Sequence, residues 1–505
     1  MKLARRKFLK AGAGSLAVLA ATGCDQLPHE LKVLLVEPKE NGPFQPPAQS
    51  SLDPIIHAVN RAAFGPRPGD YERIRRLANT ADNAAADYLD QQLSPERIDD
   101  EEGKYAARRF ETLSEPLGEL FEYQQDLLQH ELMRATLARA VFSQRQLYEI
   151  MVEFWSDHFN IDPSKGDCKW LTVADDREVV RKHALGKFPE MLRASALSPA
   201  MLWYLDGRVN RRATMAEKPN ENYARELLEL HTLGVHGGYT QLDVMEVARC
   251  LTGWSVRSTG QSPYFQIGKV EFQASQHDFG AKEVLGEPIP PAPPGLKRED
   301  RDRWGRNELE HVLRIVTHHP ATARHISTKL CCRFIADEPP VEAVNQVAAV
   351  FGRTGGDIRA ALATLFATDE FRNHRGNKFK RPFNFVVSAL RAAGARTESS
   401  LEIIEYLGRM GHAPFNYPTP EGSPAQAEPW MGTLLWRWNF AVALSQNQID
   451  GTSVNLERLR KNAGGDEPLM AHLLGRKPTA EEARAFQDSG AGLALLLASP
   501  AFQRC

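Results

Sequence analysis

The sequence predicts a mainly α-helical protein, a multi-helical bundle-like array into which one small β-hairpin is inserted. From Leu52 onward, apolar residues recur at the three- and four-residue spacing of amphipathic helices. One stretch, residues 264–272, instead alternates apolar and polar side chains as a strand pair does. The body is therefore expected to be helical along nearly all of its length, built either as one unit or as two lobes.

The helices are predicted from this periodicity and from capping residues. Thr240 and Asp243 have the spacing of a capping box, and Pro320 suits a first helical turn because its missing N–H is not needed there. Long amphipathic runs cover residues 123–142 and 145–159. Shorter helices are expected at residues 175–185, 223–233, 242–251, 309–316, 321–335, 341–351, 358–366, 383–393 and 431–443.

The middle of the chain departs from the helical pattern. Residues 264–267 and 270–272 are expected to pair as a hairpin around Gly268 and Lys269, and residues 288–295 form a proline-rich surface loop. A helical domain over residues 52–505 exceeds the usual size of one compact core. A break between two lobes is therefore expected near residues 255–305.

The first 23 residues have the features of an export signal. Arg5 and Arg6 are adjacent and are followed by Phe8 and Leu9, after which residues 11–23 carry no charge. Paired arginines ahead of such a stretch are similar to the twin-arginine signal, although Ala4 stands where Ser is usual. The uncharged stretch is shorter than the roughly 20 apolar residues that a membrane-spanning helix needs. We therefore expect export to the periplasm or cell envelope.

Cys24 is the predicted site of lipid attachment. The small residues Ala21, Thr22 and Gly23 precede it, as in a lipoprotein cleavage box, although Leu would be usual at position 21. Residues 24–51 are rich in proline and suit a tether between an acylated cysteine and a folded body. The alternative is ordinary signal cleavage beside an incidental cysteine.

Charge and cysteine content argue against two broad classes of protein, nucleic-acid binders and disulfide scaffolds. Removing the five basic residues of positions 1–23 from the 62 in the chain leaves 57 against 64 acidic residues, a formal charge of −7. Nucleic acid is therefore not an expected partner, because phosphate binding needs a positive face. With Cys24 acylated, the remaining cysteines are odd in number, which argues against a disulfide scaffold. They are Cys168, Cys250, Cys331, Cys332 and Cys505.

The densest polar segment lies at residues 219–254. On a helix, Arg225, Glu226 and Glu229 share one face with Asn222. Two carboxylates one turn apart beside an arginine hold a metal ion, tune a general acid or form an internal ion network. The ion network is the plainer alternative, because Arg225 is well placed to neutralise a neighbouring glutamate.

Further candidates come from three other segments. His158 ends an amphipathic helix, where a histidine also serves as a core or capping residue. His277 stands beside Asp278 in a loop, a position that often carries function. Arg249 lies on the helix that follows the polar segment. The metal hypothesis takes His158, Glu226, Glu229 and His277 as ligands, and the catalytic hypothesis takes Arg225, Arg249 and His277.

None of these segments matches a catalytic motif with a specific mechanism. The sequence has no Gly-x-Ser-x-Gly elbow, no His-Glu-x-x-His zinc motif and no dinucleotide fingerprint after a strand. The helix with Glu226 and Glu229 also lacks the Glu-x-x-His step of di-iron bundles. The cofactor is therefore undetermined, with a metal ion as the expected candidate because twin-arginine substrates are often exported folded with a cofactor in place.

One long segment and several shorter ones form a characteristic series between about Asp53 and the C-terminus. The long segment is NENYARELLELHTLG at 220–234. The shorter ones are RAAFG at 61–65, FWSDHF at 154–159, ARCLTGW at 248–254, HDFGAK at 277–282, HPATA at 319–323, NYPTPEG at 416–422 and SPAF at 499–502. In this order they resemble a bacterial family known as domain of unknown function 1800.

The resemblance implies an exported, largely helical protein and supplies no catalytic residues. It also implies a neighbour in the genome, a second twin-arginine-exported family similar to sulfatases and alkaline phosphatases. Two functions are therefore expected as alternatives. One is a membrane-tethered periplasmic enzyme that depends on a metal or cofactor. The other is a non-enzymatic scaffold or partner of that sulfatase/phosphatase-like protein or of envelope polysaccharide.

Overall fold

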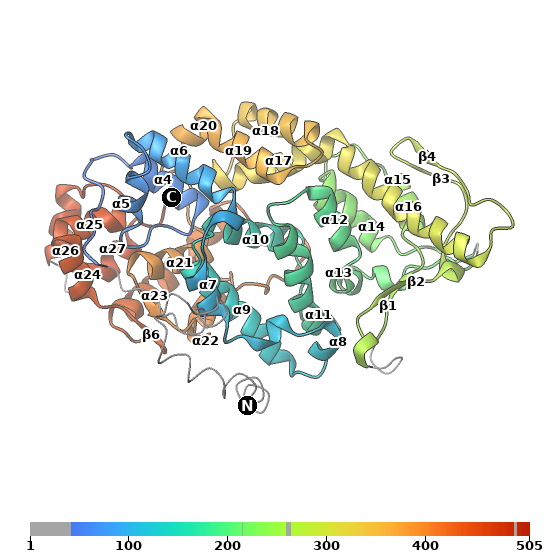
Figure 1. The fold of residues 1–505 in the computed structure, drawn as a ribbon, viewed down its shortest axis with the longest axis horizontal. Helices are drawn as coiled ribbons and strands as arrows, with labels where there is room; N and C mark the ends of the chain where they lie inside the picture. The colour runs from blue at the N-terminus through green and yellow to red at the C-terminus, as the bar shows by residue number, and fades with distance from the viewer. Residues whose placement is uncertain (1–41, 215, 259–263, 489–491) are drawn as a thin grey trace, which may run out of the picture.

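The computed structural model describes residues 42–214, 216–258, 264–488 and 492–505. Within these ranges the protein is an array of helices with three two-stranded antiparallel sheets, which confirms the predicted fold class. Figure 1 shows helices from both ends of the chain grouped on one side of the molecule, with β1–β4 at the opposite end of the long axis. The predicted signal peptide and most of the predicted tether, Cys24 included, lie outside the described residues. None of the described helices is both long and apolar enough to cross a bilayer.

The α-helices of the described ranges are α4 (Pro54–Ala62), α5 (Asp70–Arg75), α6 (Ala81–Gln92), α7 (Glu101–Ala107), α8 (Leu117–Leu120), α9 (Gln125–Phe142), α10 (Gln146–His158), α11 (Cys168–Asp175), α12 (Phe188–Ala196), α13 (Pro199–Tyr204), α14 (Asn222–Glu226), α15 (Gln241–Cys250), α16 (Arg298–His318), α17 (Pro320–Phe334), α18 (Val341–Arg353), α19 (Ile358–Ala367), α20 (Asp369–Asn373), α21 (Pro382–Ala392), α22 (Leu401–Arg409), α23 (Leu434–Ser445), α24 (Leu456–Ala463), α25 (Asp466–Leu474), α26 (Ala480–Asp488) and α27 (Gly492–Ala498). Two π-helical segments are η4 (Asp176–Arg181) and η6 (Leu227–Thr232). The 3₁₀ helices are η2 (Pro95–Arg97), η3 (Glu111–Ser114), η5 (Gly207–Val209), η7 (Tyr264–Gln266), η8 (Ala274–Gln276) and η9 (Glu428–Thr433).

The sheets are small and local. They pair β1 (Trp254–Val256) with β2 (Val270–Phe272), β3 (Lys282–Val284) with β4 (Glu287–Ile289), and β5 (Arg396–Thr397) with β6 (Thr452–Ser453).

Of the two strands predicted for the hairpin, the second is confirmed and the first is wrong. Its second strand is β2, but β2 pairs with β1, and residues 264–266 form the 3₁₀ helix η7 instead of a strand. Two further backbone bonds join Arg257 to Lys269 and Gly268, which extend the ladder, and the Lys269 N–H also closes a turn onto the Gln266 carbonyl. A second hairpin, β3–β4, turns at Leu285 and Gly286, which both have positive φ. Pro288, expected in a loop, is paired in β4.

The predicted caps are present where the sequence places them. Thr240 accepts from the Asp243 backbone and Asp243 accepts from the Thr240 backbone, which completes the capping box of α15. Pro320 opens α17, and the His319 ring accepts the Ala321 N–H at 3.2 Å. These bonds satisfy N–H groups that have no partner inside the helix.

Helix α10 runs through the interior of the array. Trp155 is fully buried and its indole N–H donates to the Ala184 carbonyl at 3.0 Å. A single buried apolar cluster that includes Trp155 extends along the chain from Phe44 to Phe502. The C-terminal turn of α10 therefore ends inside the protein, and its polar side chains need partners from other elements.

Candidate functional site

The C-terminal end of α10 is where the polar side chains of several distant segments meet. The Asn160 side-chain amide, just past the helix, donates to the carbonyls of Tyr417 at 2.9 Å and Thr419 at 2.7 Å. Gly422 continues this loop with a φ of +74°, and a Cβ there would lie 2.1 Å from the Asp157 carbonyl oxygen. The 417–422 segment is therefore seated directly on the last turn of α10.

Two acids on α10 are neutralised by two arginines. Glu153 and Asp157 are four residues apart and so lie on one helix face. The two guanidinium nitrogens of Arg381 lie 2.7 Å from Glu153 and 2.6 Å from Asp157, and Arg333 lies 3.2 Å from Glu153. The side chains of Arg333 and Arg381 are each 8% exposed. Two acids and two arginines give this buried group no net charge.

His412 completes the only group of three or more His, Cys, Asp or Glu donors in the described residues whose atoms lie within 4.8 Å of one another; its other members are Glu153 and Asp157. Its chemistry does not favour a divalent ion. The His412 Nδ1 atom accepts the Phe383 N–H at 3.1 Å, so a neutral ring carries its proton on Nε2 and neither nitrogen has a lone pair free for a metal. Burial, together with nearby arginines, holds the pKa of His412 well below its usual value.

A second set of contacts joins Lys329 of α17 to His158, the last residue of α10. The Lys329 Nζ atom lies 2.9 Å from His158 Nδ1, and His158 Nε2 donates to the His231 carbonyl at 3.1 Å. These partners fix the tautomer, because Nε2 carries the proton and Nδ1 is the acceptor. Burial, with the nearby charge of Lys329, lowers the pKa of His158 well below its usual value.

The surroundings of Lys329 disfavour its charged form. Burial lowers the pKa of Lys329 from 10.5 to about 8, although the Asp157 carboxylate opposes the shift. Burial and Lys329 lower the pKa of His231 to about 3 and that of His325 to about 4. Near neutral pH Lys329 is therefore mainly an ammonium with a minor uncharged fraction, and the uncharged amine is the state that a general base or a nucleophilic lysine requires.

A small cavity lies beside the acids of α10 and His412, and neither Lys329 nor His158 is among its lining residues. It has a volume of about 40 Å³, enough for a water molecule and too small for a substrate without movement of the loop. Its walls combine apolar side chains with Glu153, Asp157 and Asn160, and the 412–417 loop forms one side. Burial raises the pKa of Asp157, although Arg381 opposes this shift. The polar wall thus holds a carboxylate that gains a proton more readily than an exposed aspartate.

The four predicted metal ligands lie in three different environments. His158 belongs to the Lys329 contacts described above. Glu226 and Glu229 lie near each other, and burial together with Glu229 raises the pKa of Glu226. Glu229 accepts a hydrogen bond from Tyr239 at 3.2 Å. In the described part of the chain these two acids, His158 and His277 do not form a group of closely spaced donor atoms.

His277 is buried in a separate ion network near β3. Its Nε2 atom lies 3.3 Å from Glu308, and its Nδ1 atom lies 2.8 Å from the Thr252 carbonyl. Lys282 lies 2.7 Å from the same glutamate. The ring of His277 is fully buried, hydrogen-bonded through Nδ1 to the Thr252 turn and packed with Nε2 near Glu308 of α16.

The two arginines of the catalytic hypothesis also form ion pairs with neighbouring acids. Arg249 lies 2.7 Å from Asp278 and 2.7 Å from Glu246. Arg225 lies 3.1 Å from Glu221 in an i,i+4 pair on a partly exposed surface, the ion-network alternative that the sequence leaves open.

Sequence reasoning did not select Glu153, Asp157, Lys329, Arg381 or His412. One local pattern could have indicated part of the site, because Glu153 and Asp157 have the i,i+4 spacing that places both acids on one helix face. The other partners come from segments more than 170 residues further along the chain, and no local pattern predicts which of them meet.

The fold and this centre define a large helical protein in which a partly buried lysine contacts a buried histidine beside a neutralised acid–arginine group. The family model described as "Protein of unknown function (DUF1800)" matches residues 57–504. The chain belongs to this family, as its resemblance to domain of unknown function 1800 predicts. Neither the curated proteins nor the solved structures contain a match to it.

Proposed function

We propose that this protein is an exported, membrane-tethered enzyme of the cell envelope whose reaction centre lies at the C-terminal end of α10. Lys329 acts as the general base, and His158 orients it through the 2.9 Å contact with Nζ. The Asp157 carboxylate, which lines the cavity and pairs with Arg381, partly offsets the effect of burial on the pKa of Lys329. The observation that carries the proposal is the 2.9 Å contact between the Lys329 amine and the Nδ1 atom of His158 at the end of α10, in surroundings where burial lowers the pKa of Lys329.

The arrangement favours acid–base chemistry over a metal-dependent reaction at this place. A divalent ion among Glu153, Asp157 and His412 would add two positive charges to carboxylates that already pair with Arg333 and Arg381. It would also require the proton of His412 to leave Nε2 while Nδ1 faces a backbone donor. Lys329, in contrast, needs no added group to accept a proton.

The test compares the wild-type chain with Lys329→Met. Each purified protein is incubated with polysaccharide, peptidoglycan and lipid fractions of the envelope of its own bacterium, and released products are identified by liquid chromatography and mass spectrometry. A product that forms with wild type and with the exposed-site control Lys182→Met, but not with Lys329→Met, supports the proposal. Identical product profiles for all three proteins contradict it.

A second candidate function is a non-enzymatic scaffold that binds the co-exported sulfatase/phosphatase-like protein. The observation that favours it is an exposed apolar strip on η9 and α23. Met431 is 52% exposed, Leu434 55% and Leu435 65%, and such strips often mark protein contacts. Affinity purification from native membranes tests it. Enrichment of that partner by wild type but not by Leu435→Lys supports the scaffold, and equal enrichment by both counts against it.

A further inference from the structure

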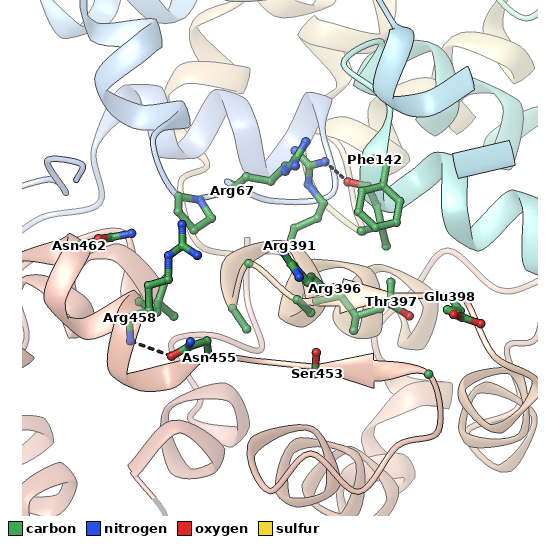
Figure 2. Close-up of a pocket in the computed structure, with 18 of the residues that line it drawn as sticks. Arg67, Phe142, Arg391, Arg396, Thr397, Glu398, Ser453, Asn455, Arg458 and Asn462 are labelled. Carbon is green, nitrogen blue, oxygen red and sulfur yellow. Dashed lines mark hydrogen bonds between the residues drawn. The ribbon is translucent and has the colours of Figure 1, made fainter. Parts of the chain in front are cut away.

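Two cavities border α21 and differ in size and in how their polar side chains are bonded. Figure 2 shows the larger, of about 590 Å³, where Arg391 donates to the Val141 carbonyl at 2.7 Å. The smaller has a volume of about 160 Å³ and is lined by Lys380 and Ser388 together with residues of α4, α25 and the C-terminal segment. One water needs about 10–15 Å³ and drug-sized ligands about 300–1,000 Å³, so the smaller cavity suits a group of a few non-hydrogen atoms.

A lysine and a serine form a hydrogen-bonded pair in the wall of the smaller cavity. The Lys380 Nζ atom lies 2.9 Å from the Ser388 Oγ atom. Both side chains are buried, with Ser388 1% and Lys380 5% exposed. Within the described residues, neither the amine nor the hydroxyl has another hydrogen-bond partner. The two groups are therefore committed to each other, at the distance that proton transfer between them requires.

The surroundings of Lys380 favour loss of its proton. No acidic side chain of the described ranges forms an ion pair with it, and its other close contact is the Phe502 ring, whose centroid lies 4.0 Å from Nζ. Burial lowers the pKa of Lys380 from 10.5 to about 8, with Arg437 adding to this shift and Cys505 opposing it. A buried lysine of this kind can accept a proton from a neighbouring hydroxyl group.

The backbone on both sides of the pair is held in place. The Lys380 N–H donates to the Gln503 carbonyl at 2.9 Å. Gly65 packs directly on the serine, because a Cβ added there would lie 2.7 Å from Ser388 Oγ, and its carbonyl accepts from Arg391 at 2.8 Å. Fixed neighbours of this kind keep two reacting atoms at a constant separation.

A third polar side chain, that of Asn60 on α4, lines the same cavity. It makes no hydrogen bond in the part of the chain that the structure describes. Its Oδ1 atom and the Ser388 Oγ atom lie 3.7 Å and 2.7 Å from the point where a Cβ on Gly65 would stand. An asparagine amide also carries two donors, and such donors stabilise the negative oxygen that forms during acyl transfer.

We propose that Ser388 and Lys380 form a serine–lysine dyad that hydrolyses esters of short acyl groups. Such dyads are recognised by the contact between nucleophile and base, and they occur on unrelated folds. Asn60 donates to the carbonyl oxygen of the ester. The inference stands apart from the Lys329–His158 pair, because neither of those residues lines this cavity.

The reaction has two steps. Ser388 Oγ attacks the carbonyl carbon while the Lys380 amine takes the hydroxyl proton and passes it to the departing alkoxide. The ester C–O bond breaks, an alcohol leaves and an acyl-serine remains. Water then attacks the acyl-serine with Lys380 as base, the carboxylic acid is released and the proton returns to Ser388.

Labelling with an alkyl fluorophosphonate tests the dyad in the full chain, purified in detergent. The serine oxygen bonds to phosphorus, fluoride leaves, and mass spectrometry of the peptides locates the adduct. We expect an adduct on Ser388 in wild type, none at this position in Ser388→Ala, and at least tenfold slower labelling in Lys380→Met. Lys380→Arg keeps the positive charge but cannot act as a base, so it should also be slow.

Two control variants should label at position 388 as wild type does. Ser195→Ala changes a helical serine that is also 1% exposed and whose hydroxyl has no partner in the described residues. Lys329→Met separates this result from the proposed function. Circular dichroism establishes that each variant is folded. The dyad is wrong if wild type gains no adduct on Ser388 at millimolar probe, or if Lys380→Met or Lys380→Arg labels at the wild-type rate.

Hydrolysis of 4-nitrophenyl acetate and 4-nitrophenyl decanoate tests the substrate class. The rate that wild type shows in excess of Ser388→Ala should have a kcat/KM at least tenfold higher for the acetate, because a ten-carbon chain exceeds the cavity. Equal rates for wild type and Ser388→Ala on the acetate, or a preference for the decanoate, would overturn the proposal of short acyl esters.

Discussion

At the residue scale, the lysine centre, which is the contact pair of Lys329 and His158, holds a positive charge that burial disfavours. The Lys329 ammonium has its own hydrogen bond to His158 but no carboxylate within ion-pair distance among the contacts of the described residues. Its neighbours Glu153 and Asp157 are committed to Arg333 and Arg381. Natural proteins keep such groups where a reaction needs them, at a cost in stability.

Lys329→Met should therefore stabilise the protein at neutral pH. The pKa of Lys329 is about 8 in the folded protein against 10.5 unfolded. Below pH 8 both states are protonated and the full penalty is present. Between pH 8 and 10.5 the unfolded chain binds more protons, so wild-type stability rises with pH and approaches that of the variant.

The expected gain is about 1–2 kcal/mol at pH 7, since the pKa shift outweighs one lost hydrogen bond. Urea unfolding at a series of pH values measures it, and Lys182→Met, at an exposed position, serves as the reference. A variant that is less stable than wild type at pH 7, or a difference that does not shrink above pH 8, would show that the amine is not held at a penalty.

The acid–arginine group predicts the opposite effect for Arg381→Gln. Removing this guanidinium leaves Asp157 without its cation and Glu153 with Arg333 alone. Breaking a buried pair in this way costs about 3–5 kcal/mol, because a desolvated charge loses its partner. Arg193→Gln breaks a surface pair whose side chains are 55% and 42% exposed, and should cost under about 1 kcal/mol.

The same denaturation series distinguishes an ion network from a metal centre. If the carboxylates are neutralised by arginines alone, the midpoint of wild-type unfolding should not change when a chelator is added. A chelator-dependent midpoint that disappears in Glu153→Gln would instead favour a bound ion, and the acid–base proposal would then lose its argument from charge.

At the element scale, the 417–422 loop is held against α10 by backbone proximity as well as by Asn160. Gly422 and Gly411 have the same φ of +74°. At Gly422 an added Cβ would lie 2.1 Å from the Asp157 carbonyl oxygen, whereas at Gly411 its nearest contact is Trp430 at 3.9 Å. The two glycines therefore share the cost of a left-handed backbone and differ in the space around them.

Gly411→Ala should cost about 1 kcal/mol, and Gly422→Ala clearly more, because the loop must move away from the end of α10. Differential scanning calorimetry measures both melting temperatures. Displacement of the loop should also make the Lys329 amine react faster with acetic anhydride, read by mass spectrometry. Equal melting temperatures for the two variants would mean that the loop is not tightly seated.

The elements were predicted with different success for physical reasons. Helices such as α10 and α17 follow from local periodicity, because each buries one face of its own sequence. The partner of β2 did not follow, because Trp254 and Phe272 pair across a connection that local alternation does not encode. The lysine centre has the same property, since Lys329 and His158 are 171 residues apart.

At the scale of the whole molecule, three segments that carry the family resemblance meet at one place. FWSDHF contributes Asp157 and His158, NYPTPEG contributes the loop over Asp157, and NENYARELLELHTLG contributes the His231 carbonyl that accepts from His158. The resemblance alone did not say what these segments do together. Their convergence makes the end of α10 the first place to look for activity.

Delivery of this body to a membrane is the prediction at the largest scale. Arg5→Lys with Arg6→Lys keeps the charge but removes the arginine pair, so the protein should accumulate in the cytoplasm.

Cys24→Ser should still be exported but should lose labelling by radioactive palmitate and move to the aqueous phase of a detergent partition, because a diacylated cysteine provides the hydrocarbon that anchors it. If Cys24→Ser stays on membranes after an alkaline wash, attachment does not come from the acyl chains. The exposed strip at Leu434 and Leu435 would then be the next surface to mutate.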